Sequence, residues 1–455
     1  MAAKGITNRL YYGGKVFETK VATLIDRCRA CGSDDISELF SLGDIRVARF
    51  SDDTEDAVKA PLTFFRCEKC TYLQLLHNIN TDLVFYDQYG YESGINPSMV
   101  RELKSIVESS RKIVDVKKGD IWLDIASNDG ELLLQVTGRG VLRVGFDPSR
   151  DVALKGSERL IKKFGAENTR TFIDYFNKKA WKLSLGNRKA KVITAIAVFY
   201  SVQEPNKFLE DVKEVLDPEG LFVVQQNYTP EMIRQLAFCN VVHEHVTYPT
   251  FTAFNTLVEK HGFEAVDVSK NEINGGSFRV YLKHKGAKVK VRGGKGRVAK
   301  FLEAEKEEGY LGSKVYKDFA MRVAKKGRQV NKYIKKEVVR RGKKVYGLAA
   351  STRGNTRLQV WGLGPELISG IAERNPRKVG KKTLGIPIVD DDEALKKADL
   401  LFVSIWFYGD SIIDPYKDFL KKGGKMLFPS SPTGEPYLVE MVKGKIVKKP
   451  LPFNV

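Results

Sequence analysis

One segment of the chain, GDIWLDIASNDGELLLQVTGRGVLRVGFDPS, strongly favours an α/β fold because apolar strands alternate in it with a turn and a helix start. Residues 121–125 form a short apolar strand, the small-residue turn ASNDG follows, and ELLLQV begins a helix. A second apolar strand, residues 142–146, ends at Asp147. Asp147 lies 23 residues after Asp124, about the spacing at which a doubly wound fold presents a carboxylate to ribose hydroxyls. The segment therefore predicts a nucleoside-binding unit in the middle of the chain.

The turn after the first strand departs from the glycine-rich pattern of dinucleotide-binding folds. From the strand end through the turn there is one glycine, Gly130, and there are two acids, Asp124 and Asp129. These carboxylates would repel a pyrophosphate, whereas S-adenosylmethionine carries a sulfonium and an amino group and no phosphate. The loop therefore favours S-adenosylmethionine as the cofactor. The alternative is an ordinary α/β turn in which Asn and Asp cap the helix.

Two later stretches repeat the alternation of strand and helix, and 455 residues allow two to four domains. Residues 192–199 predict a buried strand, 205–215 a helix and 221–225 another strand. Nearer the C-terminus, KKVYGLAASTRGNTRLQVW predicts a strand, a small-residue loop and a helix, and ADLLFVSIW and GGKMLFPS predict two more strands. Hydroxyls and backbone N–H groups in the loop at 347–356 suit an anion, and a plain βα turn is the alternative.

Four of the five cysteines form two Cys-x-x-Cys pairs, each in a polar turn: Cys28 with Cys31, and Cys67 with Cys70. Two thiolates three residues apart can hold one tetrahedral ion, and two such turns complete a closed four-cysteine zinc site. Four protein ligands leave no open position for a substrate, so the predicted role is structural. Disulfides and a catalytic redox pair are the alternatives, and disulfides are rare in the cytosol. Cys239 stands alone and is expected to be a small buried side chain.

The net charge of +20 is concentrated in one part of the chain. Between Lys283 and Lys344 there are 22 Lys and Arg against 6 Asp and Glu, so this segment carries +16. Apolar residues recur in it at roughly helical spacing, namely Phe319, Val323, Val330, Tyr333 and Ile334. We interpret the segment as a solvated helix joining two domains. Attraction of a polyanion, whether a nucleotide diphosphate, RNA or lipid, is the alternative.

The sequence also indicates a location. No apolar run approaches the ~20 residues that span a bilayer, and the N-terminal MAAKGITNRLYYGG lacks the apolar core of a signal peptide. We therefore expect a cytoplasmic protein with no membrane span.

The stretch VVHEHVTY holds two of the five histidines, His243 and His245, on either side of Glu244. In a strand the two histidines would share one face and the glutamate would point away, whereas in an irregular turn all three could converge. Imidazole is a natural general base near neutral pH. Substrate hydrogen bonding and a metal or purely structural role are the alternatives, although no third ligand cluster accompanies the pair.

Taken in order, the motifs of this chain resemble those of the three-domain, zinc-containing, S-adenosylmethionine-dependent C-methyltransferases that act on nucleotide-linked deoxysugars. Besides the cysteine pairs, the resemblance rests on these motifs: YDQYGYESGINPSM, DIASNDGELL, GFDPS, FYSVQEPNKFL, HEHVTY, NEINGGSFRVYLKH, GLAASTRGNTRLQ and ERNPRKVG. It covers nearly the whole chain.

The resemblance implies an α/β protein of three domains. A small zinc-binding domain would occupy residues 1–80, and a Rossmann-like class I methyltransferase domain residues 81–285. The basic helical linker would be 286–343, and a second Rossmann-like domain would be 344–455. The cofactor would be bound by Asp124, Ser127, Asn128, Asp129, Gly130 and Asp147.

In the family, a nucleotide-linked keto sugar loses a proton beside its carbonyl, and the resulting enolate attacks the methyl group. His245 is our choice of base, with Glu244 and His243 as further catalytic residues. Tyr89 and Tyr91 match a tyrosine pair of the family that would cover the enolate. Two departures are Val242, where relatives often have Tyr, and Ser201, where they often have His.

The resemblance places the substrate between domains, with Gly275, Arg279, Ser351 and Asn355 as candidate contacts. The predicted function is therefore C-methylation of a nucleotide-linked keto-deoxysugar by a monomer or homodimer. The alternative is an S-adenosylmethionine-dependent RNA methyltransferase with a structural zinc module. Against it, Lys and Arg concentrate on one helix instead of alternating with aromatics around the site.

Overall fold

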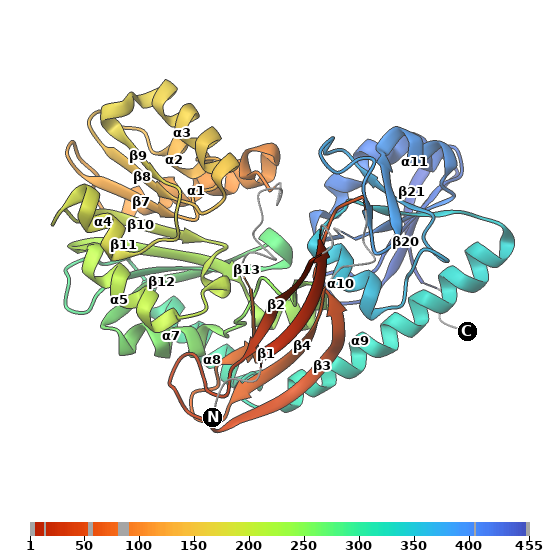
Figure 1. Ribbon diagram of the computed structural model, residues 1–455, viewed down its shortest axis with the longest axis horizontal. Coiled ribbons are helices and arrows are strands. Elements are labelled where there is room, and N and C mark those ends of the chain that lie inside the picture. The colour runs from red at the N-terminus through yellow and green to blue at the C-terminus, as the bar shows by residue number, and fades with distance from the viewer. Residues whose placement is uncertain (1–4, 13–14, 53–57, 81–90, 405, 452–455) are drawn as a thin grey trace.

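The computed structural model describes residues 5–12, 15–52, 58–80, 91–404 and 406–451 (Figure 1). Two α/β lobes lie side by side, the N-terminal strands lie at the base between them, and a long helix, α9, runs beneath the second lobe. Among the helices of the described residues, none is both long enough and apolar enough to cross a membrane.

The first lobe is a seven-stranded sheet in the order β12-β13-β11-β10-β7-β8-β9. Its strands are β7 (Ile121–Ile125), β8 (Leu142–Phe146), β9 (Thr169–Phe172), β10 (Ala190–Ile196), β11 (Leu216–Asn227), β12 (Phe263–Asn271) and β13 (Ser277–His284). The central strands pair in parallel, and β13 pairs antiparallel with β11 and β12. This is a doubly wound sheet with an antiparallel strand inserted at one side. It confirms the class I methyltransferase fold expected for this part.

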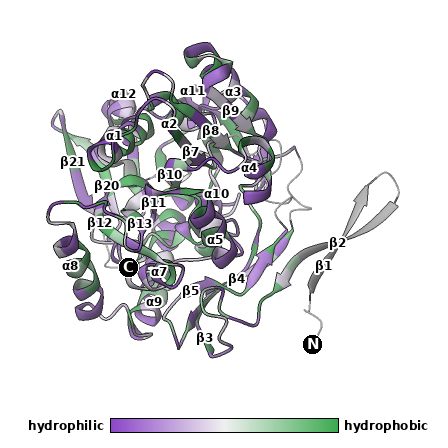
Figure 2. Cartoon of the chain, turned by 90° about the vertical axis from the view of Figure 1, so that its left-hand side faces the viewer, coloured by the Kyte–Doolittle hydropathy of each residue, from purple (hydrophilic) through white to green (hydrophobic). Residues whose placement is uncertain are grey.

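Helices cover both faces of this sheet because the central strands are apolar on both sides. The helices are α1 (Pro97–Ile113), α2 (Glu131–Gln135), α3 (Arg150–Phe164), α4 (Lys178–Leu185), α5 (Pro205–Val215), α7 (Phe251–Lys260) and α8 (Gly294–Glu307). The short helix α6 (Thr229–Arg234) packs instead in the core that contains α9. On β7, Trp122 packs with the helices α1 and α2, and Leu123 packs with α4, α5 and α7 on the other face. In Figure 2 the central strands are largely hydrophobic, and hydrophilic residues gather on the outer helices α3 and α8.

The second lobe is an eight-stranded sheet in the order β16-β17-β15-β14-β18-β19-β20-β21. Its strands are β14 (Val345–Leu348), β15 (Gly370–Glu373), β16 (Lys382–Thr383), β17 (Ile386–Asp390), β18 (Leu400–Val403), β19 (Lys425–Phe428), β20 (Tyr437–Val442) and β21 (Lys445–Pro450). Its helices are α10 (Thr352–Val360), α11 (Asp391–Lys397) and α12 (Lys417–Lys421). The strands from β17 to β19 are parallel, so the expected Rossmann-like C-terminal unit is present.

The N-terminal part forms two small antiparallel sheets, β1-β2-β6 and β3-β4-β5. Their strands are β1 (Gly5–Tyr12), β2 (Lys15–Leu24), β3 (Ile36–Arg46), β4 (Lys59–Cys67), β5 (Leu73–Leu75) and β6 (His77–Ile79). One cysteine pair lies in the turn between β2 and β3, and the other closes the turn between β4 and β5.

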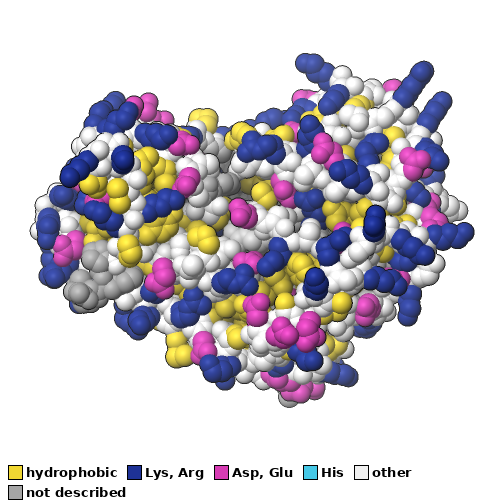
Figure 3. Space-filling view, turned by 180° about the vertical axis from the view of Figure 1, so that it is seen from behind, with side chains coloured by type: hydrophobic (Ala, Val, Ile, Leu, Met, Phe, Trp, Pro, Cys, Tyr) yellow, Lys and Arg dark blue, Asp and Glu magenta, His cyan; other side chains and the backbone are white. Residues whose placement is uncertain are grey.

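The basic segment is more than a solvated linker. In α8, Val298, Phe301 and Leu302 pack on the core of the first lobe. Helix α9 (Lys314–Tyr333) is helical as predicted, and its apolar stripe is buried in a core that continues from the N-terminal strands into the second lobe. Figure 3 shows Lys and Arg spread over the visible face of both lobes and interspersed with acids, so on that face they form no single basic patch.

Candidate active site

Strained backbone occurs just after three strands, β7 and β10 of the first lobe and β14 of the second. Ala126 after β7, Ala197 after β10 and Ala349 after β14 have φ angles of 60°, 56° and 68°. A side chain makes this left-handed conformation costly, and such strain concentrates at ligand sites. These strand ends are also where open α/β sheets bind ligands. The geometry therefore marks one candidate edge in each lobe.

The loop after β7 is shaped by close contacts with its neighbours. Asn128 and Gly130 also have positive φ, at 51° and 75°. A Cβ at Gly145 would lie 2.5 Å from the Ser127 hydroxyl. Strand β8 can therefore lie this close to the loop because residue 145 has no side chain. Likewise, a Cβ at Gly156 in α3 would lie 2.8 Å from the Asp129 carbonyl carbon. Glycines outside the loop thus set its position.

The loop's fit to α3 gives a test. We expect Gly156→Ala to destabilise the protein by about 1–3 kcal/mol through overpacking and to weaken S-adenosylhomocysteine binding. Gly296→Ala is the matched control, because Gly296 lies in helix α8 with no atom within 4 Å of the added Cβ. It should leave both quantities unchanged or slightly raise stability. Thermal melting and calorimetric titration measure the two effects, and equal behaviour of the variants would contradict this account of the loop.

Two of the predicted cofactor residues are buried carboxylates beside the loop. Asp147 accepts hydrogen bonds from the backbone N–H of Asn128 and of Ser149, each at 2.9 Å. Asp124 is 4% exposed and accepts a hydrogen bond from the Thr194 hydroxyl at 2.6 Å. Burial raises the pKa of Asp124 to about 7. A cation brought beside it would favour the ionised form, which suits a sulfonium or an ammonium group.

The other acid of the loop, Asp129, already has a partner. Arg159 Nη1 lies 2.8 Å from its carboxylate, and Gly94 N donates to it at 3.1 Å. Asn128 Oδ1 accepts from Ser93 N at 2.9 Å, and its Nδ2 donates to the Tyr91 carbonyl at 3.0 Å. Asp129 and Asn128 thus hold the segment at 91–94 over the loop, which the sequence did not indicate.

The HEH stretch is a turn, so the strand interpretation is wrong. His245 N donates to Val242 O at 3.1 Å, which closes the turn. The three side chains diverge. His243 Nε2 donates to Ala60 O at 3.0 Å, in the N-terminal part, whereas His245 Nδ1 donates to Asn240 O at 3.0 Å within the first lobe.

Glu244 faces the second lobe. Burial raises the pKa of Glu244 to about 7, and a hydrogen bond with Thr352 and the charge of Arg353 oppose that rise. Both opposing residues lie in the first turn of α10. The HEH turn is therefore the point at which all three parts of the chain meet.

His245 is held in one tautomer. Because a carbonyl oxygen only accepts, Nδ1 carries the proton and Nε2 keeps the lone pair. The Tyr200 ring packs against the imidazole at 3.8 Å between centroids, and Tyr248 Oη donates to the His245 carbonyl at 2.9 Å. Burial, followed by the charge of Arg353, lowers the pKa of His245 to about 3, so the ring is neutral at pH 7. A neutral, oriented imidazole is what a base requires.

The residues around His245 form a polar cluster that sequence reasoning found only in part. Burial, and to a smaller degree Tyr91 and Glu244, raises the pKa of Tyr200 well above its usual range, whereas Arg353 lowers it. Tyr91 is thus near this cluster, while Tyr89 lies outside the described residues. Tyr200 adjoins Ser201, one of the two departures. In the sequence, only the aromatic side chain of Tyr200 could have indicated that it belongs to this cluster.

The four predicted substrate contacts do not all come together, because Arg279 and Asn355 are bonded within their own lobes. Arg279 Nη2 bonds Glu102 at 2.6 Å and its Nε bonds Gln225 at 2.8 Å, so this guanidinium is occupied within the first lobe. Asn355 pairs with Thr383 in the second lobe. Ser351 Oγ caps α10 by accepting from Gly354 N at 3.0 Å. Gly275, with φ 82°, belongs to the first lobe and faces Trp406 and Phe407 of the second lobe.

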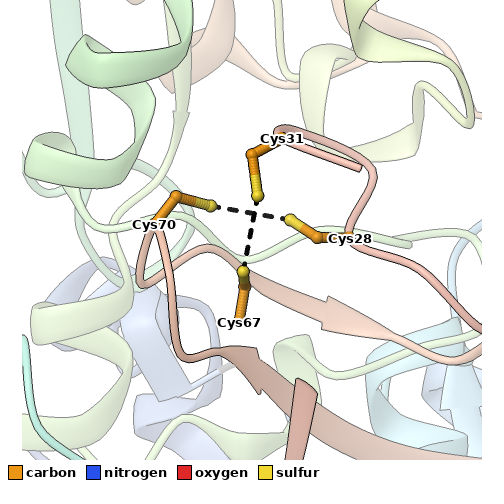
Figure 4. A group of neighbouring side chains, drawn as sticks. All are labelled: Cys28, Cys31, Cys67 and Cys70. Carbon is orange, nitrogen blue, oxygen red and sulfur yellow. Dashed lines mark hydrogen bonds between the residues drawn. The ribbon is translucent and has the colours of Figure 1, made fainter. Parts of the chain in front are cut away.

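The four cysteines of the two pairs meet as predicted. Figure 4 shows their sulfurs pointing toward a common centre. All four sulfurs lie within 4.8 Å of one another, with Cys28 and Cys70 at 3.6 Å and Cys31 and Cys67 at 3.5 Å. Zn–S bonds of about 2.3 Å in a tetrahedron require sulfurs about 3.8 Å apart, so the cluster fits zinc. A disulfide needs about 2.05 Å, which rules out that alternative for these pairs in this structure.

Comparison with known proteins places the chain among methyltransferases. Residues 101–268 match a family model described as a methyltransferase domain, and residues 272–430 match one described as the C-methyltransferase C-terminal domain. The curated protein C-methyltransferase NovU of Streptomyces niveus is 29% identical over 412 residues, covering 89% of this chain and 95% of NovU.

Two solved structures each resemble part of the chain. The cyclopropane synthase MmaA2 from Mycobacterium tuberculosis is 11% identical with a TM-score of 0.33, covering 39% of this chain and 82% of its own. A SAM-dependent methyltransferase from Aquifex aeolicus is 19% identical with a TM-score of 0.28, covering 40% and 97%.

Proposed function

Because the chain belongs to the C-methyltransferases that use S-adenosylmethionine, we propose that it methylates a carbon atom of a nucleotide-linked keto-deoxysugar. One observation carries the proposal. The HEH turn holds an oriented imidazole of the methyltransferase lobe near enough to Arg353, at the start of α10 in the second lobe, for the guanidinium charge to lower the pKa of His245. A base and a phosphate-binding group would thus act on two ends of one substrate.

The loop after β7 would hold the cofactor with the residues that the sequence indicated. Bound S-adenosylmethionine supplies an electrophilic methyl group. Asp147 is placed to accept hydrogen bonds from ribose hydroxyls, because it lies just after β8 beside the loop and a carboxylate oxygen can accept more than one hydrogen bond. Asp124 supplies negative charge behind the loop, and Ser127 and Gly130 give the loop its shape.

His245 is the proposed base for the acceptor. The C–H bond beside the sugar's carbonyl breaks, the proton passes to Nε2, and the electron pair becomes the enolate. The burial and positive charge that lower the pKa of His245 also make it a weak base. A bound phosphate beside Arg353 would cancel part of that charge and strengthen the base. Substrate binding would then help to activate its own deprotonation.

The enolate oxygen needs donors, and the cluster contains candidates. Tyr91 and Tyr200 carry hydroxyl groups near the turn, and Arg353 carries a charge. Glu244, with its raised pKa of about 7, can hold or release a proton near neutral pH. These groups take the place of the family's tyrosine and histidine at positions 242 and 201.

The second lobe would bind the nucleotide. The loop after β14 ends at the capped N-terminus of α10, where backbone N–H groups favour phosphate. Glu373, at the end of β15, accepts a hydrogen bond from Ala350 N at 2.8 Å. Asp147 makes the same kind of bond to the loop of the first lobe. This correspondence, together with Arg353, supports a second nucleoside site facing the first.

Zinc would be held by Cys28, Cys31, Cys67 and Cys70 in a structural role. Their reduced state also fits the cytoplasmic location proposed here. RNA methylation remains the competing function, favoured only by the positive charge of α9 and its neighbours. The buried face of α9 and the acids among the exposed Lys and Arg argue against it.

Calorimetric titration tests the proposal. S-adenosylhomocysteine should bind, and at least one nucleoside diphosphate should bind independently of it. Arg353→Ala should weaken the second binding at least tenfold and leave the first unchanged. Binding of S-adenosylhomocysteine together with methylation of transfer RNA, and with no response to any nucleoside diphosphate, would replace the sugar with RNA as the substrate.

A further inference from the structure

Strand β5, which begins three residues after Cys70, runs beside the segment that follows His245. Leu75 N donates to Val246 O at 2.9 Å, and Tyr248 N donates to Leu73 O at 2.9 Å. Between them, Gln74 and Thr247 form an antiparallel bridge. The cysteine module is thus joined by backbone hydrogen bonds to the chain that carries the proposed base.

Gln74 ties this strand to the other cysteine pair. Its side chain is 0% exposed, Oε1 accepts from Arg29 N at 2.9 Å, and Nε2 donates to Arg27 O at 3.1 Å. Arg27 and Arg29 are the two neighbours of Cys28. One buried amide therefore fixes β5 against the first cysteine turn, while the second turn leads directly into β5.

The first cysteine turn is itself anchored on the methyltransferase lobe. Arg29 O accepts from Asn206 Nδ2 at 2.6 Å, and Ala30 O accepts from Lys260 Nζ at 3.1 Å. Asn206 and Lys260 belong to α5 and α7. The position of Gln74 is therefore fixed relative to the sheet and not only relative to the N-terminal strands.

The segment after His245 is also held from its other side. Val246 N and Thr247 N both donate to Tyr200 O, at 2.8 and 3.0 Å. Tyr200 in turn packs its ring on His245 at 3.8 Å. Displacing β5 would move Val246 and Thr247, and with them both the imidazole and the ring that packs against it.

We propose that Gln74 is a positioning residue for the methyl-transfer reaction, through which the four-cysteine module sets the place of His245. The inference rests on the proposed role of His245 as the base. A displacement of about 1 Å at a reacting group costs on the order of 100-fold in rate. A bound zinc ion would act here through structure alone, by fixing the two turns that hold Gln74 and β5.

The test compares three variants of the full-length protein. Gln74→Ala removes both side-chain hydrogen bonds, and we expect kcat to fall about 10- to 100-fold with zinc content and S-adenosylmethionine KM unchanged. Gln74→Glu keeps the acceptor for Arg29 N but places a second carboxylate oxygen against Arg27 O in a fully buried site, so it should recover none of the rate. Asn331→Ala is the control, since Asn331 also donates to two backbone carbonyls, those of Trp361 and Gly362, and neither belongs to the HEH turn or to β5. It should lose stability without a change in kcat.

A second readout does not depend on activity. Amide hydrogen exchange should quicken for Val246, Thr247 and Tyr248 in Gln74→Ala and in wild type after removal of metal by a chelator, and it should stay slow at 121–125. Unchanged kcat and unchanged exchange at 246–248 in Gln74→Ala would overturn the proposal. Loss of zinc or of cofactor binding together with kcat would also overturn it, because Gln74 would then be merely structural. If no sugar substrate is turned over even by wild type, the proposed function fails, and the exchange experiment still decides the link from Gln74 to the turn.

Discussion

Replacing His245 by asparagine should reduce methyl transfer by roughly 10²- to 10⁴-fold, the usual contribution of a general base. Asparagine keeps an N–H near the place of Nδ1, where it can still donate to Asn240 O, and it removes the Nε2 lone pair. The fold around the turn is therefore spared. Binding of S-adenosylhomocysteine by calorimetry should remain within about twofold of wild type, since the loop after β7 is untouched.

His243 provides the comparison for that variant. It is as buried as His245, at 6% against 9% exposed, but its Nε2 donates to Ala60 O in the N-terminal part. His243→Asn should therefore lower the melting temperature while most of the rate remains. A larger rate loss in His243→Asn than in His245→Asn would show that the wrong histidine has been assigned.

Replacing Cys67 by serine should abolish zinc binding at the four-cysteine cluster and unfold the N-terminal part of the protein. Structural zinc binding contributes roughly 10 kcal/mol or more in small zinc domains, and a missing fourth thiolate forfeits much of it. Cys67 is fully buried, so no solvent molecule can easily replace its sulfur. The zinc content measured by metal analysis should fall from one ion per chain to none, and the melting temperature should decrease.

Cys239→Ser is the control for this experiment. Cys239 is 1% exposed, and its sulfur lies 3.0 Å from Arg357 Nη2, away from the cluster. The change of sulfur to oxygen is the same, yet zinc content should stay at one per chain. Full zinc occupancy in Cys67→Ser would contradict the four-cysteine site.

Local patterns predicted the fold well because they depend on nearby residues. The strand ending at Ile125 and the acid after Phe146 appear where the alternation of apolar and small residues placed them. The cysteine cluster could be predicted equally well, since the Cys-x-x-Cys spacing places two thiolates on one turn, where both can bind the same ion. The helical spacing of its apolar residues predicted that α9 is a helix, but it did not predict that α9 is buried, since the segment was expected to be a solvated linker.

Contacts between distant residues could not be predicted in the same way. Arg279 donates a hydrogen bond to Glu102, 177 residues earlier in the chain. No local sequence pattern predicts such a pair. The HEH stretch has a spacing that fits a strand as well as a turn, and the turn is favoured by tertiary partners in three parts of the chain. Tyr200 and Arg353 approach His245 only after both lobes have folded.

Hydrogen exchange at carbon tests the central claim most directly. A nucleotide-linked keto-deoxysugar is incubated in D₂O with the enzyme and S-adenosylhomocysteine, so that deprotonation can occur without methyl transfer. The account predicts that wild type introduces deuterium at the carbon beside the carbonyl and that His245→Asn does so at least 100-fold more slowly, by mass spectrometry and NMR. A wild-type enzyme that binds the sugar and leaves this position unlabelled, or a His245→Asn variant that labels it as fast as wild type, would contradict it.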